Sequence, residues 1–152
     1  MVKKIISGGQ TGADRAALDF AIRHGIPHGG RVPKGRKAED GRVPDIYKVR
    51  EMASSSYSAR TEQNALDADG TLIISHGRLT GGSSYTAWMA RKHGRPLLHL
   101  DMAQVQVHEA AQRLRAWLDA NSIRVLNVAG PRHSTDPDIY DTTMRVLEAT
   151  VG

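Results

Sequence analysis

Short apolar runs alternate with amphipathic segments along most of the chain, and no other feature of the sequence limits the fold as strongly. The apolar runs predict strands over residues 3–7, 26–32, 70–75, 96–100 and 124–128. The segments between them predict helices over residues 13–24, 60–68, 83–93, 103–120 and 137–150, the last with Asp136 as its N-cap. Strands that alternate with helices build parallel sheets. The sequence therefore predicts an α/β, three-layer, Rossmann-like fold with a mostly parallel sheet of about five strands and helices on both faces.

The 152 residues suit one domain, and no repeat or linker divides them, so a single Rossmann-like ligand-binding domain is expected over residues 1–152. Residues 33–59 combine proline, glycine and charge and predict a long irregular segment. The absence of cysteine excludes disulfides, thiolate metal sites and cysteine nucleophiles. No apolar run suits a signal peptide or reaches the roughly 18 residues of a membrane span. We therefore expect a cytoplasmic protein without membrane contact.

Three of the predicted strands end in glycine-containing turns, over residues 7–15, 75–84 and 127–132. In an open parallel sheet such turns lie at one edge, where ligands bind. A helix start offers free N–H groups and a partial positive charge, and glycine lets a phosphate approach the backbone. The turns therefore predict a site for a phosphate-bearing small molecule.

The candidate ligand-binding residues belong to these turns, to the basic segment after the second strand, or to the helix that follows it. They are Gly8, Gly9, Gln10, Thr11, Gly12, Asp14, Arg15, Lys34, Arg36, Arg60, Thr80, Gly81, Gly82, Ser83, Gly130 and Arg132. The first turn lacks both the Gly-Lys-Ser/Thr of a P-loop and the Gly-x-Gly-x-x-Gly spacing of dinucleotide-binding folds. ATP hydrolysis and NAD-dependent dehydrogenation are therefore disfavoured.

Several residues also have simpler interpretations. Asp14 could serve the helix dipole alone, and a surface ion pair between Arg15 and Asp19, four residues apart, is the simplest account of both. Of the seven histidines, His76 and His133 lie on the predicted edge and are candidates for acid or base chemistry. No histidine spacing matches a metal motif, so no structural metal is expected, and no residue is assigned as catalytic. Trp88 and Trp117 are predicted to lie in the core.

The formal net charge of +5 suggests an anionic partner. Only 5% of the residues are aromatic, which is low for a protein that stacks the bases of single-stranded nucleic acid. Nucleic acid is therefore disfavoured as the ligand, although the charge keeps a nucleic-acid-binding or partner-binding module among the hypotheses.

Taken in order, several blocks resemble the putative molybdenum carrier family over nearly the whole chain. The clearest are Ser-Gly-Gly-Gln-Thr-Gly-Ala-Asp-Arg at 7–15, Pro-Lys-Gly-Arg at 33–36, Arg-Thr-Glu-Gln-Asn at 60–64, Leu-Thr-Gly-Gly-Ser at 79–83 and Leu-Asn-Val-Ala-Gly-Pro-Arg at 126–132. The family is similar to a wider group of Rossmann-like proteins that includes molybdenum-cofactor carriers and Lonely Guy phosphoribohydrolases. The resemblance implies a parallel sheet and a phosphate-bearing ligand on the glycine loops, either molybdenum cofactor (molybdopterin) or a nucleotide.

The resemblance leaves a carrier and a hydrolase as alternatives. Where the hydrolases carry a glutamate after their Gly-Gly turn, this chain has Trp88, so a non-enzymatic carrier is the first hypothesis. The alternative is a nucleotide-processing hydrolase, in which Glu62 would have to replace that carboxylate. Relatives of this fold often pair through helices, so a homo-oligomer is a candidate assembly.

Overall fold

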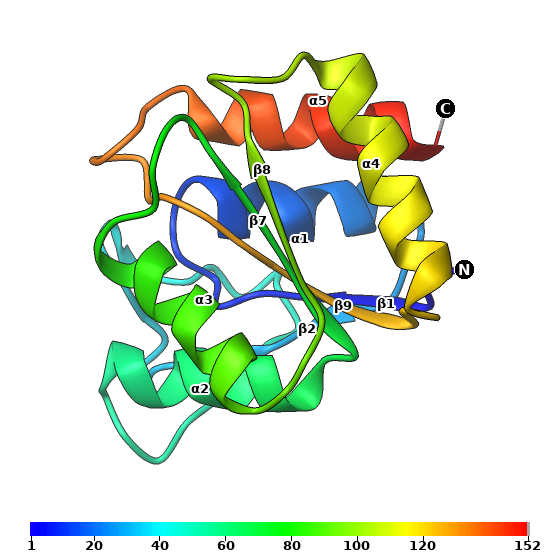
Figure 1. Cartoon of the computed structure of the whole chain (residues 1–152). Helices are drawn as coiled ribbons and strands as arrows, with labels where there is room; N and C mark the ends of the chain where they lie inside the picture. Colours follow the sequence, from blue (N-terminus) through cyan, green and yellow to red (C-terminus); the bar gives the residue numbers. More distant parts are fainter. Residues whose placement is uncertain (152) are drawn as a thin grey trace.

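A computed structural model describes residues 1–151; Gly152, the last residue of the predicted domain, lies outside the described residues. Its main sheet has five strands, and every pairing in it is parallel (Figure 1). In spatial order the strands are β2 (His28–Gly29), β1 (Lys4–Ile6), β9 (Val125–Ala129), β7 (Gly70–Ser75) and β8 (Leu97–Asp101). This order confirms the predicted parallel, five-stranded α/β sheet.

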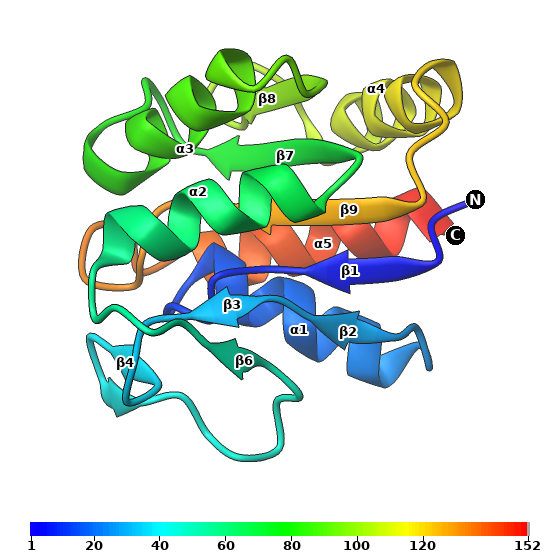
Figure 2. The ribbon, with the colours of Figure 1, turned by 90° about the horizontal axis from the view of Figure 1, so that it is seen from below.

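Helices cover both faces of this sheet, as Figure 2 shows. The five are α1 (Ala13–Arg23), α2 (Tyr57–Asp67), α3 (Gly81–Lys92), α4 (Val107–Ala120) and α5 (Ile139–Val151). Helices α1, α4 and α5 pack together on one face, and α2 and α3 pack together on the other. Every residue of the interior strand β7 is buried because both of its faces are covered. The three-layer Rossmann-like arrangement is thus confirmed.

The segment predicted to be irregular holds short strands and a small apolar cluster of its own. Strand β3 (Arg31–Val32) pairs with β6 (Arg50–Glu51), and β4 (Lys37–Ala38) forms a hairpin with β5 (Gly41–Arg42). The cluster is separate from the main core and consists of Leu18, Val32, Ala38, Val43 and Tyr47. It therefore fixes the hairpin against α1, a role that the sequence pattern did not indicate.

The predicted second strand is split at Gly30. Its φ is +122°, and a Cβ at this position would lie 2.1 Å from the Ser7 backbone oxygen. The chain turns there because only glycine tolerates both constraints. His28–Gly29 consequently pair with β1 in the main sheet, whereas Arg31–Val32 leave it for β6.

Some predicted helix boundaries were wrong by a few residues. Helix α2 begins three residues early because the Ser56 hydroxyl caps it, accepting from the Ala59 amide. Helix α4 begins at Val107 rather than at Ala103, and α5 begins at Ile139 rather than at Pro137. The Asp136 carboxylate instead accepts from the Asp138 amide within a turn before the helix.

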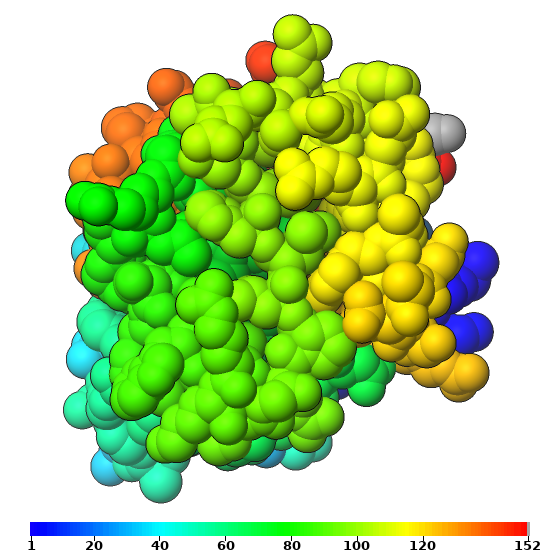
Figure 3. Space-filling model, viewed as in Figure 1, coloured from blue at the N-terminus to red at the C-terminus, as the bar shows by residue number. Residues whose placement is uncertain are grey.

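Trp88 was also placed wrongly, because its side chain lies on the outer surface of α3 and is 57% exposed. Small residues such as Ala87 and Ala90 face the sheet in its place and let the helix approach closely. Figure 3 shows the face formed by α3, β8 and α4, with the segment of residues 131–138 beside the turn after β7 at its margin. Within residues 1–151, no helix combines the length and apolarity that crossing a membrane requires.

Candidate functional site

A cavity of about 560 Å³ lies at the edge of the sheet where β1, β7 and β9 end. It opens between the turns that follow these strands and the start of α2. Ten of the predicted ligand-binding residues line it: Gly8, Gln10, Asp14, Arg60, Thr80, Gly81, Gly82, Ser83, Gly130 and Arg132. The structure therefore brings parts of all three predicted turns and one helical arginine to a single hollow.

The turn over residues 80–83 opens directly into this cavity at the start of α3. The Ser83 and Ser84 amides both donate to the Thr80 carbonyl, and among the described residues no acceptor is found for the amides of Gly81 and Gly82. The Thr80 side chain makes no capping hydrogen bond, and the first turn of α3 has no acidic residue. This helix start therefore keeps unpaired donors and an uncompensated positive end of its dipole.

The two glycines of this turn have no packing role within the protein. A Cβ built on Gly81 or Gly82 meets no atom within 4 Å. Gly81 has a φ of +50°, which by itself favours glycine, but Gly82 has no positive φ. Glycine in a helix costs about 0.5–1 kcal/mol relative to alanine. The glycine at position 82 thus leaves free space in the cavity and does not relieve a clash within the protein.

A buried pair of opposite charges forms the floor of the cavity. Arg60 on α2 is 8% exposed, and its Nη1 donates to the Gly8 oxygen at 2.6 Å and lies 3.6 Å from Asp14 Oδ2. Burial raises the pKa of the Asp14 carboxyl to about 6, against the attraction of Arg60. Burial also lowers the pKa of the Arg60 guanidinium, and Asp14 opposes that change. For both groups, burial affects the pKa more than the charge of the partner does. An additional anion near Arg60 would therefore stabilise the charged guanidinium.

Three cations surround the ring of Tyr57, which lines the cavity at the start of α2. The Lys37 Nζ lies 4.3 Å from the ring centroid, and the guanidinium carbons of Arg60 and Arg132 lie 5.3 and 5.6 Å from it. The Tyr57 ring attracts each cation, but the cations repel one another. This side of the cavity therefore suits a negatively charged group.

Gln10 is 5% exposed and also lines the cavity. Its Oε1 accepts from the backbone amides of Thr11 and Glu39, at 3.1 and 2.8 Å. Its Nε2 is buried and has no partner in the structure. An unpaired buried amide costs about 1–3 kcal/mol, so a ligand acceptor at this position would recover that energy.

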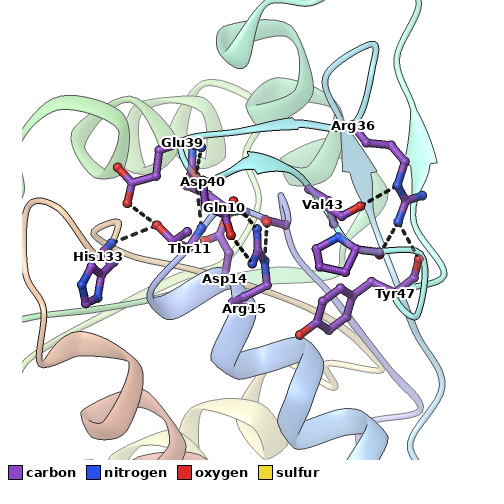
Figure 4. A network of polar contacts seen from close by, with 12 residues as sticks. Gln10, Thr11, Asp14, Arg15, Arg36, Glu39, Asp40, Val43, Tyr47 and His133 are labelled. Atoms are coloured by element: carbon purple, nitrogen blue, oxygen red, sulfur yellow. Dashed lines mark hydrogen bonds and ion pairs between the residues drawn. The ribbon is translucent and has the colours of Figure 1, made fainter.

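Most of the turn over residues 8–12 is paired within the protein, as Figure 4 shows in part. Within the turn, the amides of Gly9, Gln10 and Thr11 donate to Ser7 Oγ, Asp14 Oδ2 and Gln10 Oε1. The Thr11 hydroxyl donates to Glu39 and accepts from the His133 amide. Gly9, Thr11 and Gly12 do not line the cavity, so ligand contact by them stays a prediction that this geometry does not favour.

Three predicted basic ligands lie outside the cavity. Arg15 makes two hydrogen bonds of 3.0 Å to the Asp40 carboxylate and donates to the Gly9 oxygen. Arg36 donates to the backbone oxygens of Val43, Pro44 and Tyr47, while Lys34 is exposed on the surface. Their roles as ligands likewise stay predictions without geometric support.

The expected ion pair between Arg15 and Asp19 was wrong. Asp19 instead accepts hydrogen bonds from the hydroxyls of Tyr47 and Tyr140. The tyrosines come from distant parts of the chain, so helical spacing could not reveal them.

Several residues that line the cavity were missed by the sequence analysis. The most informative are Tyr57 and Tyr85, two half-buried aromatic rings from α2 and α3, and Asn127, which lies in the middle of β9 and donates to Thr71 Oγ1. A polar residue inside an otherwise apolar strand was the one available signal, and it would have identified Asn127.

The acid–base candidates lie away from the cavity lining. His76 Nδ1 contacts the Asp136 carboxylate at 2.5 Å, and His133 lines a neighbouring hollow. Glu62 contacts His93 at 2.8 Å and does not line the cavity. Across residues 1–151 no cluster of three or more His, Asp or Glu side chains is placed to hold a metal ion.

Comparison with known proteins agrees with this fold. The model of the circularly permutated YpsA SLOG family matches residues 5–151. The crystal structure of a putative molybdenum carrier protein from Syntrophus aciditrophicus SB is 56% identical to this chain, with a TM-score of 0.99. That match covers 99% of this chain and 96% of the other, and it confirms the resemblance to the molybdenum carrier family. Among curated proteins none matches. The chain belongs to the circularly permutated YpsA SLOG family.

Proposed function

We propose that this protein is a binding or carrier protein for a phosphate-bearing small molecule, with the phosphate at the turn over residues 80–83. The open Gly81–Gly82 turn is the observation that carries the proposal. Its two amides have no acceptor among the described residues, and neither glycine is demanded by a packing contact. A phosphate supplies both the missing acceptor and the negative charge that a helix start attracts.

The remainder of the cavity favours a ligand that also has a planar ring. Tyr57 and Tyr85 offer aromatic faces, and the Gln10 amide and Asp14 carboxyl offer a donor and an acceptor for the edge of a heterocycle. Molybdenum cofactor and a nucleotide both combine a ring with a phosphate, so both fit these residues. The name of the Syntrophus protein favours the first of the two.

Molybdenum alone would have to bind as an oxyanion. The chain has no cysteine to supply a thiolate. Molybdate is a tetrahedral dianion of nearly the shape of sulfate, so amides and arginines would hold it as they hold a phosphate. Molybdate is accordingly a useful probe of the site.

The positions of the carboxylates favour binding over hydrolysis. Trp88 occupies the position of the hydrolases' glutamate and is exposed, and Glu62 pairs with His93 outside the cavity. Asp14 is the acidic side chain that lines the cavity. Its carboxylate pairs with Arg60 and accepts a hydrogen bond from the backbone amide of Gln10. We therefore expect AMP incubated with the protein to be recovered without release of adenine, measured by chromatography.

Calorimetry with molybdenum cofactor, molybdate, AMP and inorganic phosphate tests the proposal. We expect at least one of them to bind, and Arg132→Gln to weaken that binding by about tenfold or more because it removes a cation that lines the cavity. Lys34→Gln is the matched control, since it removes the same charge from an exposed residue outside the cavity. Absence of binding at millimolar concentration, or equal losses in the two variants, would overturn the proposal.

A further inference from the structure

Glu39, at the tip of the β4–β5 hairpin, places its carboxylate among donors from two other segments. Thr11 Oγ1 donates to Oε1, and Ser134 donates through its amide to Oε1 at 3.1 Å and through its hydroxyl to Oε2 at 2.5 Å. The Arg132 Nη1 lies 4.0 Å from Oε2. Figure 4 shows the Glu39 side chain reaching Thr11 beside His133. Two hydroxyls, one amide and one guanidinium therefore converge on one anionic group.

The same donors would suit a phosphate oxygen equally well. Hydroxyls, backbone amides and arginine are the groups that hold phosphates in proteins. The carboxylate of Glu39 thus stands in the position that an external anion would take. Thr11 and Arg132 were predicted as anion ligands from the sequence, and in the structure both face this internal carboxylate.

This donor set is continuous with the cavity. Ser134 and Arg132 line the cavity on one side, while Ser134, Thr11 and Glu39 line a neighbouring hollow of about 490 Å³ on the other. Ser134 therefore lies at the boundary between the two hollows, and Glu39 holds both its amide and its hydroxyl. Displacing the Glu39 side chain would free the hydroxyls of Thr11 and Ser134, and Ser134 lines the cavity that holds the turn over residues 80–83.

Glu39 is charged at neutral pH. Partial burial raises the pKa of its carboxyl, but the hydrogen bonds from Ser134 and Thr11 outweigh burial and hold the pKa below its usual value. The charged carboxylate consequently competes with a second anion for these donors and does not attract one.

The hairpin itself does not depend on Glu39 alone. The neighbouring Asp40 forms a two-bond pair with Arg15 on α1, and Ala38 packs in the apolar cluster with Val43 and Leu18. The Glu39 side chain could therefore leave its donors while the hairpin stays attached.

We propose that Thr11, Ser134 and Arg132 form a second anion subsite, occupied in the free protein by the carboxylate of Glu39, and that the ligand carries two anionic groups. The proposal rests on the proposed function, because the first anionic group is the phosphate at the turn over residues 80–83. The ligand class is a diphosphate, a bisphosphate or another compound with two separate anionic groups. Glu39 sets the affinity of the protein for this ligand, because only protein molecules whose Glu39 side chain is displaced can bind the second anionic group.

Calorimetry with pyrophosphate and inorganic phosphate tests the subsite. The proteins compared are the wild type, Glu39→Gln and Glu39→Ala. The control is Asp45→Asn, because Asp45 is an exposed carboxylate after the hairpin and lines neither hollow. We expect both Glu39 variants to raise the affinity for pyrophosphate relative to phosphate, by about tenfold in Glu39→Ala. Asp45→Asn should leave this ratio unchanged, and adding Ser134→Ala to Glu39→Gln should remove the gain.

The outcomes separate the two proposals. If the wild type binds phosphate but neither Glu39 variant changes the ratio, the second subsite is wrong and the proposed function stands. A lower melting temperature of the Glu39 variants without a change in ratio would show Glu39 to be only a structural latch, which also overturns the subsite. If neither the wild type nor any variant binds either anion at millimolar concentration, the proposed function fails as well. Glu39→Gln keeps the test valid if Glu39→Ala does not fold.

Discussion

The turns over residues 8–12 and 80–83 have similar compositions and both start a helix at the same edge of the sheet, but the protein uses them differently. In the first turn, Ser7, Asp14 and Gln10 accept from the amides of residues 9–11, and a Cβ on Gly12 would lie 2.4 Å from the Pro131 oxygen. In the second turn, a Cβ on Gly81 or Gly82 meets no neighbouring atom, and no acceptor for their amides is found among the described residues. Glycines of the first turn thus serve packing, and those of the second leave room for a ligand.

The largest effect that this contrast predicts is on stability in the first turn. Gly12→Ala adds a methyl against a backbone oxygen at a φ of +82°. Strain and overpacking together should lower the free energy of unfolding by about 3 kcal/mol, measured by urea denaturation. A loss below about 0.5 kcal/mol would mean that the first turn is not tightly packed.

The second turn should respond in the opposite sense. Gly82→Ala should stabilise the protein by about 0.5–1 kcal/mol because alanine is the better helix former. The same methyl should weaken molybdate or AMP binding by about tenfold or more, because it fills the space that an anion needs to reach the amides.

Ser84→Ala provides the control for this second change, since it alters the exposed surface of the same helical turn outside the cavity. Its effect on binding should be less than about twofold. If Gly82→Ala is stabilised and binds molybdate as the wild type does, the space at Gly82 has another purpose, and the contrast between the two turns loses its functional meaning.

The smallest predicted effect concerns pH and follows from Asp14. Its folded pKa of about 6 lies above the usual 3.8, so the carboxyl gains its charge as the pH rises from about 5 to 7. The added negative charge in the cavity should weaken sulfate binding several-fold over this range, since the charge of sulfate itself stays constant. Asp14→Asn should make the affinity nearly independent of pH, as followed by calorimetry.

The free energy of unfolding should also decrease as the pH rises. The folded protein retains a proton on Asp14 that the unfolded chain releases near pH 4, so this stabilisation is complete below about pH 4 and is lost as the pH rises through 6. Sulfate affinity that rises with pH in the wild type would contradict the placement of Asp14 beside the anion.

The fold could be predicted from the sequence because the alternation of strand and helix patterns depends on local spacing. The candidate site could be predicted only in part. The order of strands and turns placed Gly81, Gly82 and Arg132 at one edge, and the structure brings them to one cavity. Local patterns, however, do not show which donors a protein fills with its own acceptors.

The residues that were misjudged illustrate this limit. Pairing of Arg15 with Asp40 and of Thr11 with Glu39 depends on a hairpin about 25 residues away, held by an apolar cluster that has no periodic pattern. Tyr57 was missed because α2 starts earlier than its apolar spacing suggested, at the Ser56 cap. These contacts are tertiary, so propensity and spacing carry little information about them.

The central claim is that an anion binds the amides of the turn over residues 80–83. A crystal soaked in molybdate tests it most directly, because the anomalous scattering of molybdenum locates the ion without reference to the protein. We predict a molybdenum peak within hydrogen-bond distance of the Gly81 and Gly82 amides and on the Arg132 side of the cavity. A peak at Arg15 and Asp40 instead, or none in the cavity at a molybdate concentration that saturates the protein in solution, would contradict the account.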